Sequence, residues 1–139
     1  EIDGESMEFG YRTSVIKNRA FIVLEAVLNL TKGDKGEILA KMEELAQRRK
    51  EKQPLEFASA GSTFKRPEGH FAGKLIMDAG LCGYTVGEAM VSEKHCGFIV
   101  NTSKASASDV VAVIREVQRR VKEQFGVTLE TEVVFLGDF

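Results

Sequence analysis

The chain is 139 residues long, which suits a single domain, and its apolar content of 43% and charged content of 29% are those of an ordinary soluble globular protein. A formal net charge of −2 gives no overall attraction to nucleic acid, so we expect no nucleic-acid partner. No apolar run is long enough to span a membrane and no signal-peptide pattern occurs, so we expect a cytoplasmic protein without a membrane partner.

The first element that the sequence predicts is a strand. Residues 20–30 form a run rich in Phe, Ile and Val, residue types that favour strands. The stretch TKGDKG behind this run resembles a linker. We therefore predict that residues 1–31 are the tail of a separate unit, and that residues 32–139 form the domain that follows.

A helix is predicted next. Asp34 is a candidate N-cap, and Glu37 three residues later completes a capping-box pattern. The helix runs into RRKEKQP, and Pro54 lies beyond its end. Helical spacing places five apolar residues on one face, which we expect to be buried: Ile38, Leu39, Met42, Leu45 and Ala46.

The middle of the chain predicts a loop, a short helix and two strands. Residues 54–69 show no clean period, and we predict a loop there. Apolar residues at positions 72, 75, 76 and 79 predict a short helix, which Gly80 ends in the left-handed conformation. Residues 86–91 and 98–101 are predicted to be short strands.

A long helix and a last strand complete the chain. Ser106 or Ser108 caps the helix, and Gly126 follows its end. The residues expected to face inward from this helix are Val110, Ile114, Val117 and Val121. Alternating apolar residues over 127–135 predict a strand with Glu130 and Glu132 on its other face. This order of elements predicts an α+β fold, a small sheet with helices packed on one side.

The two cysteines predict neither a disulfide framework nor a metal centre. Cys82 and Cys96 are too few for a disulfide-rich scaffold, which favours a reducing compartment. His95 stands beside Cys96, but the chain offers no second close pair of ligands of the kind that zinc sites use. We therefore expect no metal.

The stretch AGSTFKRP at residues 60–67 could be either a surface turn or part of a functional site. A serine after glycine is most often a turn residue, which is one interpretation of Ser62. The other is an anion site, because Lys52, Lys65, Arg66 and Lys74 are near in sequence and such side chains bind phosphate directly. The later stretch GHFAGKL lacks the spacing of a phosphate-binding P-loop.

The basic run at residues 48–52 also has two interpretations. Arg48, Arg49, Lys50 and Lys52 lie at the predicted end of a helix, where cations favour the negative end of the helix dipole. The same cations could face a bound anion. Considered one by one, Arg12 and Glu132 have the ordinary interpretation of surface charges.

Five motifs considered together favour a specific family. FGYRTS, AGSTFKRP, FAGKLIMDAGL, VSEKHCGFIVN and FGVTLETEV occur in this order and cover nearly the whole chain. In this order they resemble the C-terminal half of the UDP-N-acetylenolpyruvoylglucosamine reductases, flavoenzymes of bacterial peptidoglycan synthesis. The resemblance implies that NADPH reduces FAD, and that UDP-N-acetylglucosamine enolpyruvate is then reduced to UDP-N-acetylmuramate.

The resemblance also implies roles for individual residues. Ser62 matches the family's proton donor, while Arg12 and Glu132 match active-site residues around the substrate carboxylate and the developing enolate. The residues expected to bind the substrate are Tyr11, Lys52, Lys65, Arg66 and His95. Three positions depart from common family residues: Arg66 replaces asparagine, Cys82 replaces lysine and Glu88 replaces glycine. The short segment before the basic run leaves no room for a substrate-capping tyrosine loop, as in type II members.

The resemblance finally implies what the chain lacks. The glycine-rich motifs of the family's FAD-binding part are absent, so we expect no cofactor-binding residues here and an inactive fragment unless that domain is joined to it. Residues 1–31 would be the tail of the FAD-binding domain, and residues 32–139 the substrate-binding domain. With its sheet missing, the strand at residues 20–30 would favour self-association. The alternative function is a stand-alone nucleotide-sugar binding module without redox activity.

Overall fold

The computed structural model describes residues 1–19 and 21–137, which divide into two compact units at Glu37 and Ile38. In the first unit, α1 (Val15–Asn18) is a single helical turn that follows Ser14. Val15 is 3% exposed, and its N–H donates to the carbonyl of Met7 at 2.9 Å. This first unit therefore has a very small buried centre.

The prediction of a strand over residues 20–30 is wrong for residues 21–30, the part that the structure describes. Residues 21–30 form no strand, and large apolar side chains such as Leu24 (94% exposed) and Val27 (88% exposed) face solvent; residue 20 lies outside the described residues. An unbroken apolar run is typical of a central strand that needs partners on both edges and cover on both faces. Residues 1–19 and 21–137 provide no such partner, so local preference alone does not make a strand.

Helix α2 (Lys35–Lys52) has the predicted start but not the predicted buried face. The Glu37 N–H donates to Asp34 Oδ1 at 2.9 Å, which is half of a capping box. None of the 18 residues of α2, all of them described, is buried. Ile38, Leu39, Met42 and Leu45 are each about half exposed or more. An amphipathic pattern shows that a face suits burial, but the partner must come from the tertiary structure.

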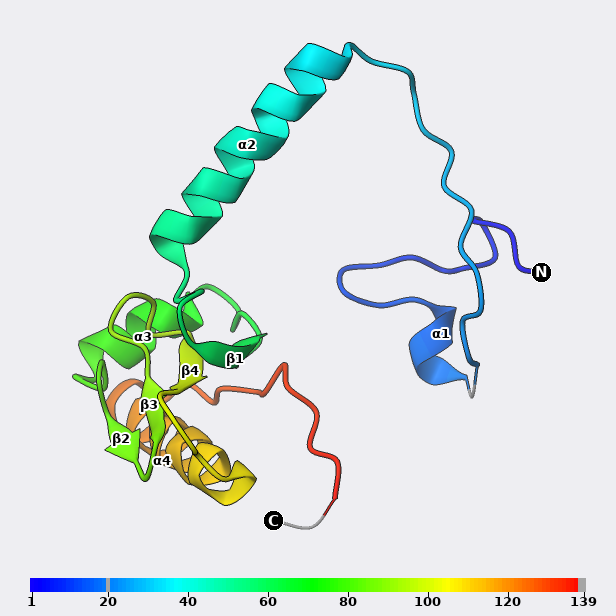
Figure 1. Cartoon of the computed structure of the whole chain (residues 1–139). Helices are drawn as coiled ribbons and strands as arrows, with labels where there is room; N and C mark the ends of the chain where they lie inside the picture. Colours follow the sequence, from blue (N-terminus) through cyan, green and yellow to red (C-terminus); the bar gives the residue numbers. More distant parts are fainter. Residues whose placement is uncertain (20, 138–139) are drawn as a thin grey trace. The chain divides into compact units, whose positions relative to one another are not determined.

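Four antiparallel strands form one sheet in the order β1-β4-β3-β2 (Figure 1). The strands are β1 (Ala58–Ser62), β2 (Thr85–Val86), β3 (Ala89–Val91) and β4 (Phe98–Asn101). β1 corrects the loop predicted at residues 54–69, since its Ala, Ser and Gly residues favour strands weakly and only pairing with β4 reveals it. The predicted strand at 86–91 is a hairpin instead, because Gly87 with φ +55° turns the chain.

Helix α4 (Ala107–Phe125) covers the sheet, and α3 (Ala72–Asp78) packs against α4. α3 is followed by Gly80 in the predicted left-handed conformation, with φ +68°. α4 contacts β2, β3 and β4. The α+β fold class is therefore confirmed. Within the described residues no helix is both long and apolar enough to cross a bilayer.

The ends and the buried face of α4 agree closely with the prediction. Ser106 and Asp109 form a reciprocal capping box, and Gly126 ends the helix with φ +72°. Ile114, Val117 and Val121 are at most 2% exposed and form the core together with strand residues, whereas Val110 is only half-buried. Val113, which was not predicted to be inward, is fully buried.

The strand predicted over residues 127–135 is reduced to one bridge, between Phe64 and Thr131. Two backbone bonds flank it: Lys65 N–H to Glu130 C=O at 2.8 Å, and Glu132 N–H to Thr63 C=O at 2.9 Å. Beyond this point the ladder does not continue, so the alternating pattern correctly indicated an extended segment but not a full strand.

The expectation of reduced cysteines is wrong, because Cys82 and Cys96 form a disulfide with their Cα atoms 5.6 Å apart. The bond joins the turn after α3 to the turn between β3 and β4. Cys96 is buried and Cys82 is exposed. Two cysteines 14 positions apart give no signal of pairing in a sequence, because the distance between them is set by the fold.

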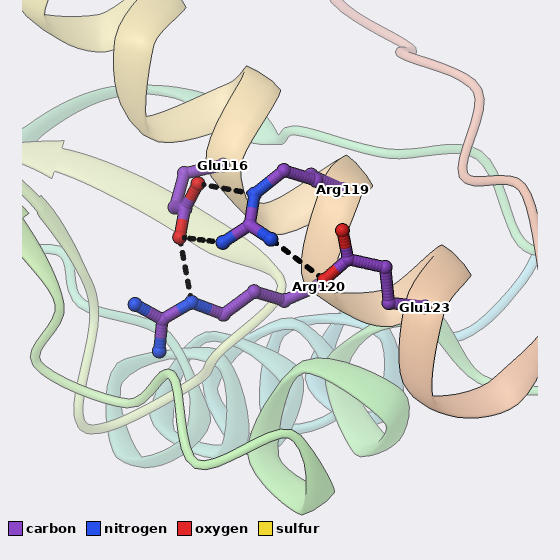
Figure 2. A network of polar contacts seen from close by, with 4 residues as sticks. All are labelled: Glu116, Arg119, Arg120 and Glu123. Atoms are coloured by element: carbon purple, nitrogen blue, oxygen red, sulfur yellow. Dashed lines mark hydrogen bonds and ion pairs between the residues drawn. The ribbon is translucent and has the colours of Figure 1, made fainter.

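The outer side of α4 carries a network of charged residues (Figure 2). The Glu116 carboxylate accepts from Arg119 at 2.7 and 2.9 Å and from Arg120 at 2.6 Å, and Arg119 also donates to Glu123 at 2.6 Å. The guanidinium of Arg120 lies 5.3 Å from the centre of the Tyr84 ring, which links the network to the segment before β2. Hydrogen bonds from Arg119 and Arg120 lower the pKa of Glu116 from 4.5 to about 2.

Breaking the disulfide should lower stability. Closing a loop of this length restricts the unfolded chain, which is worth about 3 kcal/mol. We expect reduction with dithiothreitol to lower the free energy of unfolding by about this amount, measured by urea denaturation. The double variant Cys82→Ser, Cys96→Ser should match the reduced chain and should not respond to dithiothreitol. Identical urea midpoints for the oxidised and reduced chains would contradict the prediction.

The Glu116 network should make stability depend on pH in a defined direction. The folded state holds charged Glu116 more strongly than the unfolded state, so its contribution is present above pH 4.5 and is lost as the pH falls towards 2. The difference in urea midpoint between the wild type and Glu116→Gln should therefore be largest at neutral pH and shrink on acidification. Glu43→Gln, on the exposed surface of α2, is the control and should change little. A difference that grows towards low pH would show that the sign is wrong.

Candidate functional site

A β-bulge presents Ser62. Ser59 pairs with Val100 and Ser62 pairs with Phe98, so three steps along β1 match two along β4. Gly61 takes up the extra residue with φ +85°, a conformation that other residues rarely adopt. Bulges redirect side chains and are common beside active sites. Ser62 is exposed, and it shares with its partner Phe98 one face of the sheet.

An open pocket of about 450 Å³ lies at this bulge. It is lined by Arg49, Gln53, Pro54, Leu55, Phe57, Ala58, Ser59, Gly61, Ser62 and Phe98. Arg49 Nε donates to Gln53 Oε1 at 3.0 Å, which orients the guanidinium within the last turn of α2. The pocket therefore combines a serine hydroxyl and a fixed positive charge with apolar walls, the composition expected for a small-molecule site.

Glu132 lies beside Ser62 along the backbone. The residue after Ser62 is Thr63, whose carbonyl accepts from the Glu132 N–H at 2.9 Å. Thr63 itself is only 3% exposed, and its Oγ1 accepts from the Ile99 N–H at 3.1 Å. The segment that carries Glu132 is thereby joined to Thr63, the buried residue that follows β1, and the structure brings Ser62 and Glu132 to neighbouring positions along the backbone.

Two predicted substrate-binding cations already have partners in the protein. Lys65 Nζ pairs with Glu130 at 2.9 Å, and this carboxylate raises the pKa of Lys65. The Arg66 guanidinium lies 4.0 Å from the centre of the Phe71 ring. Its Nε also donates to the His70 carbonyl at 3.3 Å. A phosphate at Lys65 would thus compete with Glu130, at a side chain that is 53% exposed.

His95 packs beside the same wall of the pocket. Its ring meets Phe98 edge to face, with the ring centres 5.0 Å apart. Nδ1 accepts from the Gly97 N–H at 3.1 Å, so in the neutral ring the proton is on Nε2, which is then a donor. Lys52 is exposed and stands three residues after Arg49 at the end of α2.

Tyr11 and Arg12 belong to the first unit and form the tip of a tight turn. Gly10 and Thr13 exchange backbone hydrogen bonds of 3.0 and 3.3 Å across this turn. Arg12 has φ +56°, a conformation that is strained for a residue other than glycine and that is found disproportionately at functional sites. Tyr11 is 82% exposed.

Three residues around the bulge have no distinct sequence signal that would place them beside Ser62. Arg49 stood in the basic run, for which the helix dipole and a bound anion were both possible explanations. Phe98 looked like an ordinary strand residue, and Thr63 followed Ser62 without any distinct pattern. Their arrangement depends on pairing between β1 and β4, which single-sequence patterns do not show.

A serine hydroxyl in this setting can act as a proton donor if its alkoxide is stabilised by nearby positive charge or hydrogen bonds. Among residues 1–19 and 21–137, no group of three or more His, Cys, Asp or Glu side chains could hold a metal ion. The chain also contains no G-x-G-x-x-G run of the kind that holds dinucleotides. The serine and the arginine that line the pocket suit a polar substrate.

The comparisons with known proteins agree with the motifs. The family described as UDP-N-acetylenolpyruvoylglucosamine reductase, C-terminal domain, matches residues 53–136. The chain is 60% identical over 137 residues to the UDP-N-acetylenolpyruvoylglucosamine reductase of Lachnoclostridium phytofermentans, covering 99% of this chain and 44% of that protein. It is 57% identical over 135 residues to the reductase of Agathobacter rectalis, covering 97% of this chain and 43% of that protein.

A solved structure gives the same result. The crystal structure of UDP-N-acetylenolpyruvylglucosamine reductase from Thermus caldophilus matches with a TM-score of 0.74 at 41% identity, covering 92% of this chain and 45% of that one. The chain thus spans less than half the length of the relatives it matches. Since the family match covers more than half of its residues, the chain belongs to the family of the UDP-N-acetylenolpyruvoylglucosamine reductase C-terminal domain.

Proposed function

We propose that this chain is the substrate-binding and catalytic part of a flavin-dependent UDP-N-acetylmuramate dehydrogenase, which uses NADPH to reduce UDP-N-acetylglucosamine enolpyruvate in peptidoglycan synthesis. The names of its relatives support this activity. The single observation that carries the proposal is the bulge at Gly61, which presents Ser62 to a pocket that Arg49 also lines. A binding module would have no need for a serine presented by a bulge in this way.

FAD and NADPH are part of the proposal, and we place the FAD site mostly in an FAD-binding domain outside these residues. No glycine-rich dinucleotide run is present, and the relatives are more than twice as long as this chain. In the proposed division, residues 1–31 belong to the FAD-binding domain and residues 32–139 to the substrate-binding domain. The fragment alone is therefore inactive, and the FAD-binding domain is its necessary partner.

Ser62 supplies the proton that completes the reduction. Reduction of the enolpyruvyl group places negative charge on the carbon next to the carboxylate, and this charge is shared with the carboxylate oxygens. The Ser62 O–H bond breaks, its proton forms the new C–H bond, and the serine alkoxide remains until solvent returns a proton. Arg12 and Glu132 act around the carboxylate and the developing enolate, where charge stabilisation has the largest effect on rate.

The remaining predicted residues bind the substrate. Lys52, Lys65 and Arg66 supply positive charge for the diphosphate or uridine side, and Tyr11 and His95 supply hydrogen-bond donors. For Lys65 this requires exchange of the Glu130 carboxylate for a phosphate oxygen. A pair this exposed contributes little to stability, so the exchange costs little.

Replacing Ser62 should affect one half of the reaction. In the full-length protein with its flavin domain, Ser62→Ala should leave flavin reduction by NADPH unchanged, because that step needs no proton on the substrate carbon. Reoxidation by the enolpyruvyl substrate should slow by about 10²–10⁴-fold, the typical worth of general acid catalysis. Stopped-flow absorbance separates the two steps. Ser62→Cys, which keeps a proton donor, should retain more activity than Ser62→Ala. Slower reduction by NADPH with normal reoxidation would reject the assignment.

The exposed apolar segment should cause self-association of the isolated chain. Residues 21–30 form no strand and carry large exposed apolar side chains, and such segments pair with other chains. Sedimentation velocity should show dimers or larger species that dissociate on dilution. The double variant Leu24→Lys, Val27→Lys should be monomeric, whereas Val134→Lys, at an exposed site elsewhere, should not change the assembly. A monomeric wild type at high concentration would contradict this prediction.

A further inference from the structure

The turn between β3 and β4 is held firmly by its own hydrogen bonds. Ser92 is 3% exposed, and its Oγ accepts from the His95 N–H at 3.3 Å. The Ser92 N–H donates to the Phe98 carbonyl at 2.9 Å, and the Phe98 N–H donates to the His95 carbonyl at 2.9 Å. Lys94 stands in the middle of this turn. The backbone of Lys94 is therefore held in place by the turn, and the same turn leads into Phe98, which lines the pocket.

The Lys94 side chain reaches to the end of α2. Its Nζ donates to the Lys50 carbonyl at 2.9 Å, 44 positions away in the sequence. The last carbonyls of a helix have no partner within the helix, and a cation there is doubly favourable because it also meets the negative end of the helix dipole. The Lys94 side chain is 35% exposed, so this bond is partly sheltered from solvent.

Lys94 also contacts the segment that leads from α2 into β1. Its Nζ lies 3.4 Å from a carboxylate oxygen of Glu56. The pKa of Glu56 is lowered, first by its own backbone N–H and then by the positive charge of Lys94. Lys50 and Glu56 stand on either side of the connection around Pro54, which is buried. One ammonium group thus holds both ends of the connection between α2 and β1.

Core packing does not fix the last turn of α2, because none of its described residues is buried. Yet Arg49 and Gln53, at the end of this helix, line the same pocket as Ser62 and Phe98. The separation between these two walls must therefore be set by contacts that join α2 to the sheet. The bond from Lys94 to the Lys50 carbonyl is such a contact, and Lys94 is not among the described residues that line the pocket.

We propose that Lys94 is a positioning residue that holds the Arg49 wall of the pocket against the Ser62 wall, and so sets the fit of the pocket for its anionic substrate. This inference rests on the proposed function for the identity of the substrate. Lys94 acts through the Lys50 carbonyl and Glu56 and takes no part in the reaction itself.

Hydrogen exchange on the 139-residue chain tests whether Lys94 holds the end of α2 in place. In Lys94→Met, which keeps length but loses charge, the amides of residues 50–57 should exchange about tenfold faster, because a hydrogen bond from a charged donor is lost. One such amide is that of Gln53, which donates to the Arg49 carbonyl at 2.9 Å. Amides in the core of α4 should keep their protection. Lys94→Arg should restore protection, and Lys104→Met, at another exposed lysine, should behave as wild type. Unchanged exchange at residues 50–57 in Lys94→Met would overturn the proposal.

Steady-state kinetics on the full-length protein with its flavin domain tests the second half. For Lys94→Met we expect KM for UDP-N-acetylglucosamine enolpyruvate to rise about tenfold while kcat falls much less, with recovery in Lys94→Arg. Faster exchange with an unchanged KM would show that Lys94 holds the helix but does not set the pocket, which also overturns the proposal.

The two proposals can fail separately. A wild-type full-length protein that does not turn over this substrate would reject the proposed function but not the role of Lys94. In that case the NMR chemical shifts of the Ser62 and Phe98 amides test the positioning role of Lys94. Changed shifts in Lys94→Met that Lys94→Arg reverses support the positioning role, and unchanged shifts overturn it.

Discussion

The pairing of β1 with β4 is the interaction on which the site depends. β4 is buried along most of its length and would form a strand in many contexts, but β1 consists of small residues with little intrinsic preference for one. Residues 58–62 form a strand because they pair with β4, and β1 has one extra residue at the bulge in this pairing. Without this pairing Ser62 would be one more residue of a flexible loop.

The bulge shows how a small distortion is supported by a firm surrounding structure. Gly61, before Ser62, supplies a conformation that is strained for other residues. Thr63, after Ser62, is buried and bonded to β4 and to the segment of Glu132. The exposed serine is thus flanked by a flexible type of residue on one side and a fixed one on the other. This arrangement positions the serine side chain without burying it, as its proposed role in the reaction requires.

Charge around the site is arranged in pairs that a ligand can exchange. Lys65 is held by Glu130 and Arg66 by Phe71, both at exposed positions where such pairs stabilise the fold only weakly. In the proposed function, a diphosphate would replace these partners with little loss of stability. Arg49 differs, because its guanidinium is oriented within α2 by Gln53 and lies in the wall of the pocket itself.

The sequence by itself determined the elements whose signals are local. Capping residues, left-handed glycines and helical spacing placed α2, α3 and α4, because these signals act over three or four residues. The order of motifs also identified the family. Only the tertiary structure decided β1, the Cys82–Cys96 bond and the neighbourhood of Ser62, Thr63 and Glu132, because each needs residues far apart in the chain to meet. The apolar residues at 21–30 and on α2 are exposed for the same reason. An apolar pattern in a sequence indicates that a surface suits burial, but only a partner in the tertiary structure can bury it.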